Sequence, residues 1–513
     1  MKIKKAFISI SSFTLISRVL GFIRDLLLAS IIGAGVTTDA FLIAFKLPNF
    51  FRRIFAEGAF NAAFVPMFAE ILQSNGKRSA IDFAEKILSL LLISTIIFVI
   101  LAQIFMPFII FLFAPGFSPE DGQYKLTVHL SRLTFPYLIL ISLVTLFSGI
   151  LNSMGKFSAV AFTPIILNLT LIFSIFLTTL FNDNPGKIIA ISVTIAGLLQ
   201  LFWLLFPLNK LNVKLYLSFP NFTKKHREFL ILFLPGVIGA SVVQINLLTD
   251  IIFASLLPAG SISFLYFADR VNQLPVGIIG VALSTALLPI LSKTILTRKD
   301  KEIFKLQNQA VEVALFFALP AMFAFIFFPN EIVKPLFERG KFSINDSLNT
   351  ALALKAYAFG LPAYILIKVM TVQFFSRKDT RTPVIVAVSC VFLNIILNYY
   401  LIKYFQHVGL AIATAISSWL NIILLVSILY KKNWWKPNIL LVTNIIKILF
   451  SSILMLITLI LINNYVINIE SYNLNKINLL ILLVVSGFVV YILLSKILGV
   501  LGVINLNELL RKK

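Results

Sequence analysis

The chain has 513 residues, of which 59% are hydrophobic and only 13% are charged, and its mean hydropathy is +0.97. This composition excludes a soluble globular protein and indicates a polytopic membrane protein. A net charge of +23 would suggest a nucleic-acid partner in a soluble protein. Here most Lys and Arg residues stand in short loops between apolar runs, as cytoplasmic loops do, so we expect a bilayer and no nucleic acid as partner.

The apolar runs are continuous and about 20 residues or longer, which predicts helices that cross the membrane and not the alternating strands of a barrel. We therefore predict an all-α membrane protein with about fourteen membrane-spanning helices. The predicted spans are residues 6–32, 37–73, 82–113, 125–152, 158–181, 187–207, 228–257, 262–292, 306–328, 347–375, 383–404, 408–430, 440–463 and 477–500.

Basic residues are concentrated in every second loop, beginning with residues 2–5 and ending with 511–513, whereas intervening loops such as 114–122 have few. Because positively charged loops stay in the cytoplasm, we expect both termini there. The start MKIKKAFISISSF resembles the basic region of a signal peptide. No small-residue cleavage site precedes Arg18, so the first helix is expected to be retained.

An internal repeat relates two halves of the chain. KLPNFFRRIFAEGAFNAAFVP at 46–66 corresponds to QLPVGIIGVALSTALLP at 273–289, and FPYLILI at 135–141 corresponds to LPAYILI at 361–367. Parallel repeats of this kind form two lobes with the substrate path between them. The repeat predicts a six-helix lobe at 1–210, a second at 211–435, and two additional helices at 436–513 that either anchor the protein or form a groove for a lipid tail.

Charged residues cluster inside the first two predicted spans. They are Arg18, Arg24, Asp25, Asp39, Lys46, Arg52, Arg53 and Glu57. Each such charge at mid-bilayer costs roughly 2.5 to 3.5 kcal/mol, which favours a watery cavity, charged partners or a charged ligand. Neighbours of opposite sign, such as Arg24 and Asp25, can pair and hold the bundle together. The cations outnumber the carboxylates, however, and this surplus favours an anion.

The second half of the repeat adds Asp269 and Arg270 close to its own Leu-Pro pair. Arginine binds phosphate oxygens in a bidentate way, so a diphosphate is a suitable ligand for several arginines that face one cavity. Catalysis has little support, because the chain has one cysteine, Cys390, three histidines and no nucleotide-binding or zinc motif. Nothing in the residues therefore argues for an enzyme or a cofactor, although they do not exclude an enzyme, and any transport would draw on an ion gradient, the membrane potential or substrate flux.

Several long motifs resemble those of the MurJ (MviN) family of bacterial lipid II flippases, in the multidrug/oligosaccharidyl-lipid/polysaccharide exporter (MOP) superfamily. They are SRVLGFIRD at 17–25, GAGVTTDAFLIAFKLPNFFRRIFAEGAF at 33–60, FVPMFAE at 64–70, YFADRV at 266–271 and GVALSTALLPILSK at 280–293. The resemblance implies two six-helix lobes plus two helices. It also implies translocation of lipid II, the undecaprenyl-diphosphate-linked peptidoglycan precursor, to the periplasmic leaflet of the inner membrane by alternating access.

The resemblance also implies roles for individual residues. Substrate-binding roles fall on Arg18, Arg24, Lys46, Arg52, Arg53 and Arg270, and gating or charge-pairing roles fall on Asp39, Glu57 and Asp269. Gln273 stands where many relatives have a glutamate. Some relatives are associated with a sodium site, for which Asp250 and Asp379 are the candidates here; a structural aspartate and an ordinary loop charge are the alternatives. Sodium or the membrane potential would then drive transport.

Lipid II is the expected substrate, and the cell-wall synthesis machinery is a further expected partner in peptidoglycan and cell-wall biogenesis, which sets cell shape. The nearest alternative is a related exporter of another polyprenyl-linked saccharide or of drugs. A drug exporter that handles cations should favour acidic cavity residues, so the sign of the charge discriminates. A membrane-embedded lipid-modifying enzyme lacks a catalytic constellation here, and a non-transporting scaffold leaves the buried charges unexplained.

Overall fold

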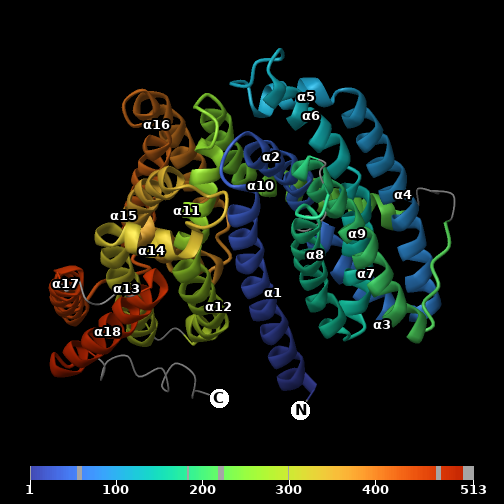
Figure 1. The fold of residues 1–513 in the computed structure, drawn as a ribbon. Helices are drawn as coiled ribbons and strands as arrows, with labels where there is room; N and C mark the ends of the chain where they lie inside the picture. Colours follow the sequence, from blue (N-terminus) through green and yellow to red (C-terminus); the bar gives the residue numbers. More distant parts are fainter. Residues whose placement is uncertain are drawn as a thin grey trace. The chain divides into compact units, whose positions relative to one another are not determined.

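The computed structural model describes residues 2–54, 60–181, 184–217, 224–297, 300–468 and 475–500. Within these ranges every regular element is a helix (Figure 1). Ten of the described helices are long and apolar enough to cross a membrane. The predicted all-α membrane fold is confirmed. Helices are suited to the bilayer because each one satisfies its own backbone hydrogen bonds in lipid. The number of spans, about fourteen, stays a prediction.

The first compact unit comprises Met1–Ser263 together with Arg339–Phe342. Its helices are α1 (Lys2–Ile32), α2 (Val36–Phe51), α3 (Asn61–Ser74), α4 (Gly76–Ile104), α5 (Met106–Phe113), α6 (Gly122–Thr134), α7 (Tyr137–Ser153), α8 (Phe157–Leu177), α9 (Pro185–Lys210) and α10 (Lys224–Ser255). Helix α1 packs along α8, and α2 packs against α6. The Thr134 hydroxyl of α6 donates to the Ala44 carbonyl of α2 over 2.6 Å.

The second compact unit comprises Phe264–Glu338 and Ser343–Lys513. Its elements are α11 (Ser261–Pro275, whose first turn belongs to the first unit), the π-helix η2 (Val276–Gly280), α12 (Val281–Leu296), α13 (Asp300–Phe327), α14 (Pro329–Phe337), α15 (Ile344–Phe375), α16 (Arg381–Lys431), α17 (Ile439–Asn468) and α18 (Lys476–Ile497). Its apolar core draws buried side chains from α13, α15, α16 and α17, among them Ala314, Leu361 and Ile448.

Two differences from the predicted spans follow from local backbone geometry. The span at 37–73 forms α2 and α3, with a π-type turn at 52–54 after α2. The spans at 383–404 and 408–430 run together as α16, which is interrupted at Gln406, where φ is 49° and ψ is −131°. Helix α10 packs against α3 and α5 of the first unit. The division into 1–210, 211–435 and 436–513 stays a prediction.

The segment Arg339–Phe342, which returns to the first unit, lies against the end of α1. The Lys341 N–H donates to the Ser30 carbonyl over 2.8 Å. Gly33 and Gly340 have φ angles of +85° and +60°, and a Cβ on Gly340 would overlap the Ser30 carbonyl oxygen. Only glycine combines this backbone conformation with so close an approach. The segment is therefore attached to α1 through backbone contacts.

Candidate functional site

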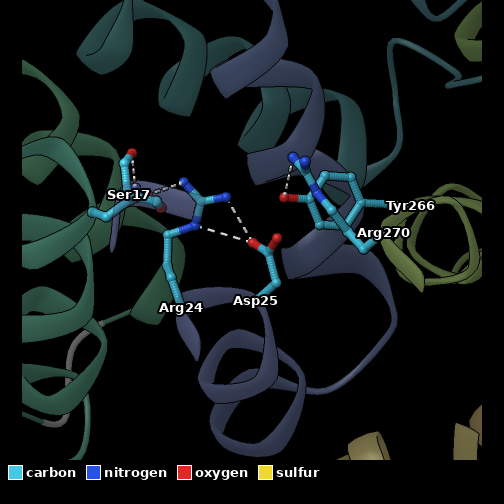
Figure 2. A network of polar contacts seen from close by, with 6 residues as sticks. Ser17, Arg24, Asp25, Tyr266 and Arg270 are labelled. Atoms are coloured by element: carbon cyan, nitrogen blue, oxygen red, sulfur yellow. Dashed lines mark hydrogen bonds and ion pairs between the residues drawn. The ribbon is translucent and has the colours of Figure 1, made fainter. Parts of the chain in front are cut away.

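Arg24 and Asp25 form a buried ion pair on α1. The Arg24 Nε and Nη2 atoms donate to Asp25 Oδ1 over 3.0 and 2.7 Å (Figure 2). Arg24 is 8% exposed and Asp25 is 1% exposed. Charge-assisted hydrogen bonds of this length are strong, and burial limits their screening by solvent. The pairing of these neighbours, considered from the sequence, is observed, and it balances one charge of each sign inside the first unit.

A second helix holds the other edge of the Arg24 guanidinium. Its Nη1 atom donates to Asn168 Oδ1 of α8 over 3.1 Å, and Asn168 Nδ2 donates to the Ser17 carbonyl over 2.9 Å. The Phe45 ring of α2 lies 5.7 Å from the Arg24 guanidinium carbon. The sequence analysis missed Asn168, although an amide inside the apolar run 158–181 was a signal. A diphosphate that binds Arg24 must compete with Asp25, and that contact stays a prediction.

Asp39 binds the N-terminus of α11. Its Oδ2 accepts from the Gly260 N–H over 2.6 Å, and its Oδ1 accepts from the N–H and the hydroxyl of Ser263 over 2.8 and 2.5 Å. The first N–H groups of a helix have no partner within it, and the helix dipole favours a negative charge there. All three residues belong to the first unit. Asp39 therefore caps a helix through neutral donors, and its expected gating role stays a prediction.

The other cations of the first unit with a predicted substrate-binding role lie on α1, on α2 and in the π-type turn. Arg18 on α1 and Arg53 in the turn are exposed, whereas Lys46 on α2 and Arg52 in the turn are half-buried. Glu57 lies outside the described residues. Adjacent residues in this turn, Arg52 and Arg53, thus present two guanidinium groups at different depths. Single π-type turns occur frequently at functional sites.

The π-type turn recurs in the second half of the repeat. It begins four residues after Pro48 in the first half and directly after Pro275 in the second, as the π-helix η2. Gly280, the last residue of η2, leaves room for Lys368 of α15, whose Cδ would lie 2.8 Å from a Cβ at that position. The sequence analysis missed Lys368, although a lysine inside the apolar run 347–375 is unusual.

Arg270 and Asp269 of α11 contact side chains one turn earlier and later on their own helix. Arg270 Nη2 donates to the Tyr266 hydroxyl over 3.0 Å, and its guanidinium carbon lies 4.7 Å from the centre of the Tyr266 ring (Figure 2). Asp269 Oδ1 accepts from Gln273 Nε2 over 3.2 Å. Arg270 is thus oriented by a cation–π contact, and the amide at position 273 is a neutral partner for Asp269.

The two sodium candidates differ in their surroundings. Asp250 is half-buried on α10. Asp379, between α15 and α16, accepts from the Thr382 N–H and hydroxyl over 3.0 and 2.7 Å and from Lys432 Nζ over 2.9 Å. Burial opposes the ionised form, but these hydrogen bonds and Lys432 lower the pKa of Asp379 to about 2. The described residues contain no group of three His, Cys, Asp or Glu side chains suited to a metal ion, and the sodium roles stay predictions.

The fold is that of a membrane transporter. A multidrug resistance MATE family transporter of the MOP superfamily, in an inward-facing conformation, superimposes with a TM-score of 0.68 over 82% of this chain and 96% of its own. Its sequence identity is 14%, so this likeness concerns the fold alone. The chain and this solved transporter therefore share a fold.

The family is shown by sequence. The family model described as "Lipid II flippase MurJ" matches residues 28–494. Probable lipid II flippases of Rhizobium tropici and of Buchnera aphidicola subsp. Acyrthosiphon pisum are 37% and 40% identical, each over 84% of this chain and 82% and 84% of their own lengths. A solved lipid II flippase MurJ in an inward closed conformation matches with a TM-score of 0.81 and 31% identity, covering 96% of this chain and 98% of its own. The chain belongs to the MurJ family of lipid II flippases, which are membrane transporters and not enzymes.

Proposed function

We propose that this protein moves lipid II across the bacterial inner membrane, from the cytoplasmic to the periplasmic leaflet, for peptidoglycan synthesis. Membership in the MurJ family supports the substrate. The observation that carries the mechanism is the charge of α1, α2 and the following π-type turn. Between residues 18 and 53 of these elements, five cations stand against two carboxylates, a formal charge of +3 (five minus two): Arg18, Arg24, Lys46, Arg52 and Arg53 against Asp25 and Asp39.

The two carboxylates leave most of the positive charge of the remaining cations without compensation, because each carboxylate already has an interaction of its own. Asp25 is matched by Arg24, and Asp39 is bound to the N-terminus of α11. A diphosphate supplies the compensating charge, because its oxygens fit the guanidinium fork in a bidentate way. In this mechanism the phosphate replaces Asp25 on Arg24, and Arg52 and Arg53 bind the neighbouring oxygens. Arg270, which Tyr266 orients, keeps its predicted substrate-binding role.

The transport cycle in this proposal is alternating access through an arginine-rich cavity, driven by sodium or by the membrane potential. Both termini lie in the cytoplasm. Cysteines introduced at Lys77 and Glu120, both exposed, in a chain whose buried Cys390 is replaced by alanine, should react with an impermeant thiol reagent from opposite sides. Reaction from the same side would overturn the orientation.

The experiment that tests the function measures externally accessible lipid II in cells depleted of their own flippase. The full-length protein should restore both growth and externally accessible lipid II. Arg52→Ala should abolish both while inserting normally, whereas Arg78→Ala, which removes an exposed arginine at the start of α4, should behave like the unmodified protein. Growth without a change in external lipid II would support the related saccharide exporter instead. Normal transport by Arg52→Ala would contradict the anion-site mechanism.

A further inference from the structure

A line of polar contacts joins α13 to the two additional C-terminal helices. Asn308, Glu312 and Phe316 stand one turn apart on α13, so they share one face of the helix. Asn308 Oδ1 accepts from Trp435 Nε1 over 2.7 Å, in the segment before α17. The Phe316 carbonyl accepts from the Tyr491 hydroxyl of α18 over 2.6 Å. This face of α13 is therefore where α17 and α18 attach to the core of the second unit.

Glu312 is the central member of this line and the one acidic residue in it. Asn444 Nδ2 of α17 donates to Glu312 Oε1 over 3.1 Å. Glu312 is 4% exposed and Asn444 is 2% exposed. Both side chains lie between α13 and α17, which pack directly against each other and are both candidate membrane spans. The carboxyl group is thus enclosed in protein within the membrane-spanning part of the chain.

No cation among the described residues ion-pairs with Glu312. The basic side chains on α13 near it and on the helices that pack against α13 are Lys293, Lys305, Lys334, Lys355, Lys368 and Lys447, and none forms a salt bridge with it within 4.0 Å. The other acidic and phenolic groups on these helices are Asp300, Glu302, Glu331, Asp346, Tyr357, Tyr364 and Tyr465, and α18 adds Tyr491. None of these hydrogen-bonds to Glu312, and Glu302, ten residues away, is about 15 Å distant along α13.

These surroundings favour the neutral form of the carboxyl group. An ionised carboxylate buried in an apolar interior needs a cation or several donors, and Glu312 has one amide. A protonated carboxyl has one donor and one acceptor, which complement the acceptor and donors of a primary amide. In the protonated form, the acid carbonyl would accept from Asn444 Nδ2, as it does in the structure, and the O–H would donate to the Asn444 oxygen. Removing the proton leaves two acceptors and loses one of the two bonds.

We propose that Glu312 is a proton-binding site that holds α17 against α13 when the proton is bound. With the proton bound, Glu312 and Asn444 form a closed acid–amide pair in the middle of the polar line. Loss of the proton places an uncompensated charge between the two helices and weakens the attachment of α17, together with α18, which packs on it. The ligand is a proton and not a metal ion. This inference is independent of the identity of the lipid that the protein moves.

Infrared difference spectroscopy of the full-length protein in nanodiscs tests the proton directly. A neutral carboxylic acid has a carbonyl stretch that is resolved from carboxylate and amide bands and shifts in D2O. We expect this band at neutral pH in the unmodified protein and its loss in Glu312→Gln. Glu338→Gln is the matched control, because Glu338 is ion-paired with Lys476 over 2.7 Å; its difference spectrum should show loss of a carboxylate band. A Glu312→Gln spectrum that loses a carboxylate band instead would overturn the proposal.

A second variant keeps the carboxyl group and removes its partner. In Asn444→Leu the acid band should move to higher frequency, because the carbonyl loses its hydrogen bond, and an unchanged frequency would contradict the acid–amide pair. Thermal unfolding tests whether the proton on Glu312 stabilises the attachment of α17 to α13. The midpoint of the unmodified protein should fall as the pH is raised into the alkaline range, and the Glu312→Gln midpoint should fall less. Equal pH dependence of the two proteins would show that the proton does not hold α17.

Discussion

The backbone N–H and the hydroxyl of Ser263 both donate to one carboxylate oxygen of Asp39, over 2.8 and 2.5 Å. These residues are 224 positions apart in the chain. The contact joins α2 to the first turn of α11, close to the end of the first unit at Ser263. A side chain of one helix thereby supplies the N-cap of another, which is a role usually filled by a residue next to the helix in sequence.

Asp39→Asn tests this cap. The amide removes the charge that the helix dipole favours, and it presents an NH2 group toward donors, so one or more bonds are lost. We expect a loss of about 1–3 kcal/mol in unfolding free energy of the purified protein. Asp346→Asn is the control, because Asp346 belongs to the capping box at the start of α15 at an exposed site, and its loss should be smaller. Equal losses would show that burial of Asp39 adds nothing.

Variants of Arg24 separate a structural role from a substrate-binding role. Arg24→Ala breaks the buried pair with Asp25 and should destabilise the protein by about 3–5 kcal/mol, as removal of one partner of a buried ion pair does. Arg24→Ala combined with Asp25→Asn should recover much of this loss, because the buried charge is also removed. If the double variant is stable and externally accessible lipid II stays absent, Arg24 binds substrate. Normal transport by the double variant would make its role structural.

Gly340→Ala should destabilise the attachment of Arg339–Phe342 to α1. The added Cβ overlaps the Ser30 carbonyl, and a φ of +60° is unfavourable for alanine. Gly76→Ala is the matched control, because Gly76 has a φ of +79° and no atom within 4 Å of a Cβ at that position. The control should lose about 1–2 kcal/mol from backbone strain alone, and Gly340→Ala should lose more. Unfolding free energies of the two variants give the comparison, and similar losses would argue against the overlap.

Ionisation of Asp379 should make the stability of the second unit change with pH in the acidic range. Its pKa is about 2 in the folded protein against an ordinary value of 3.8. A depressed carboxyl pKa contributes stability that is present above the ordinary value and is lost as the pH falls toward about 2. Asp379→Asn should therefore lower the thermal midpoint at neutral pH, and the difference from the unmodified protein should shrink across that interval. A constant difference would show that the Lys432 and Thr382 contacts do not act through the charge.

Much of the fold follows from local sequence. Apolar runs near 20 residues predicted the helices, because within lipid a segment must satisfy its own backbone hydrogen bonds. The recurrence of Leu-Pro at 47–48 and 274–275 marked two related regions, and each contains a π-type turn. Motifs such as SRVLGFIRD also predicted the family, because dense charge inside apolar sequence is rare and therefore specific.

The partners of the charged residues were decided by tertiary structure. Sequence placed Asp39 with a cation-rich group, whereas the fold gives it the N-terminus of α11. Neighbouring positions suggested Arg24 with Asp25, but not Asn168, which is 144 residues away. Local sequence did not single out Glu312, because its partner Asn444 on α17 is 132 residues away in the chain. Helix formation depends on residues within one turn of each other, whereas burial and pairing of a polar side chain depend on which helices pack together, and no local pattern encodes that.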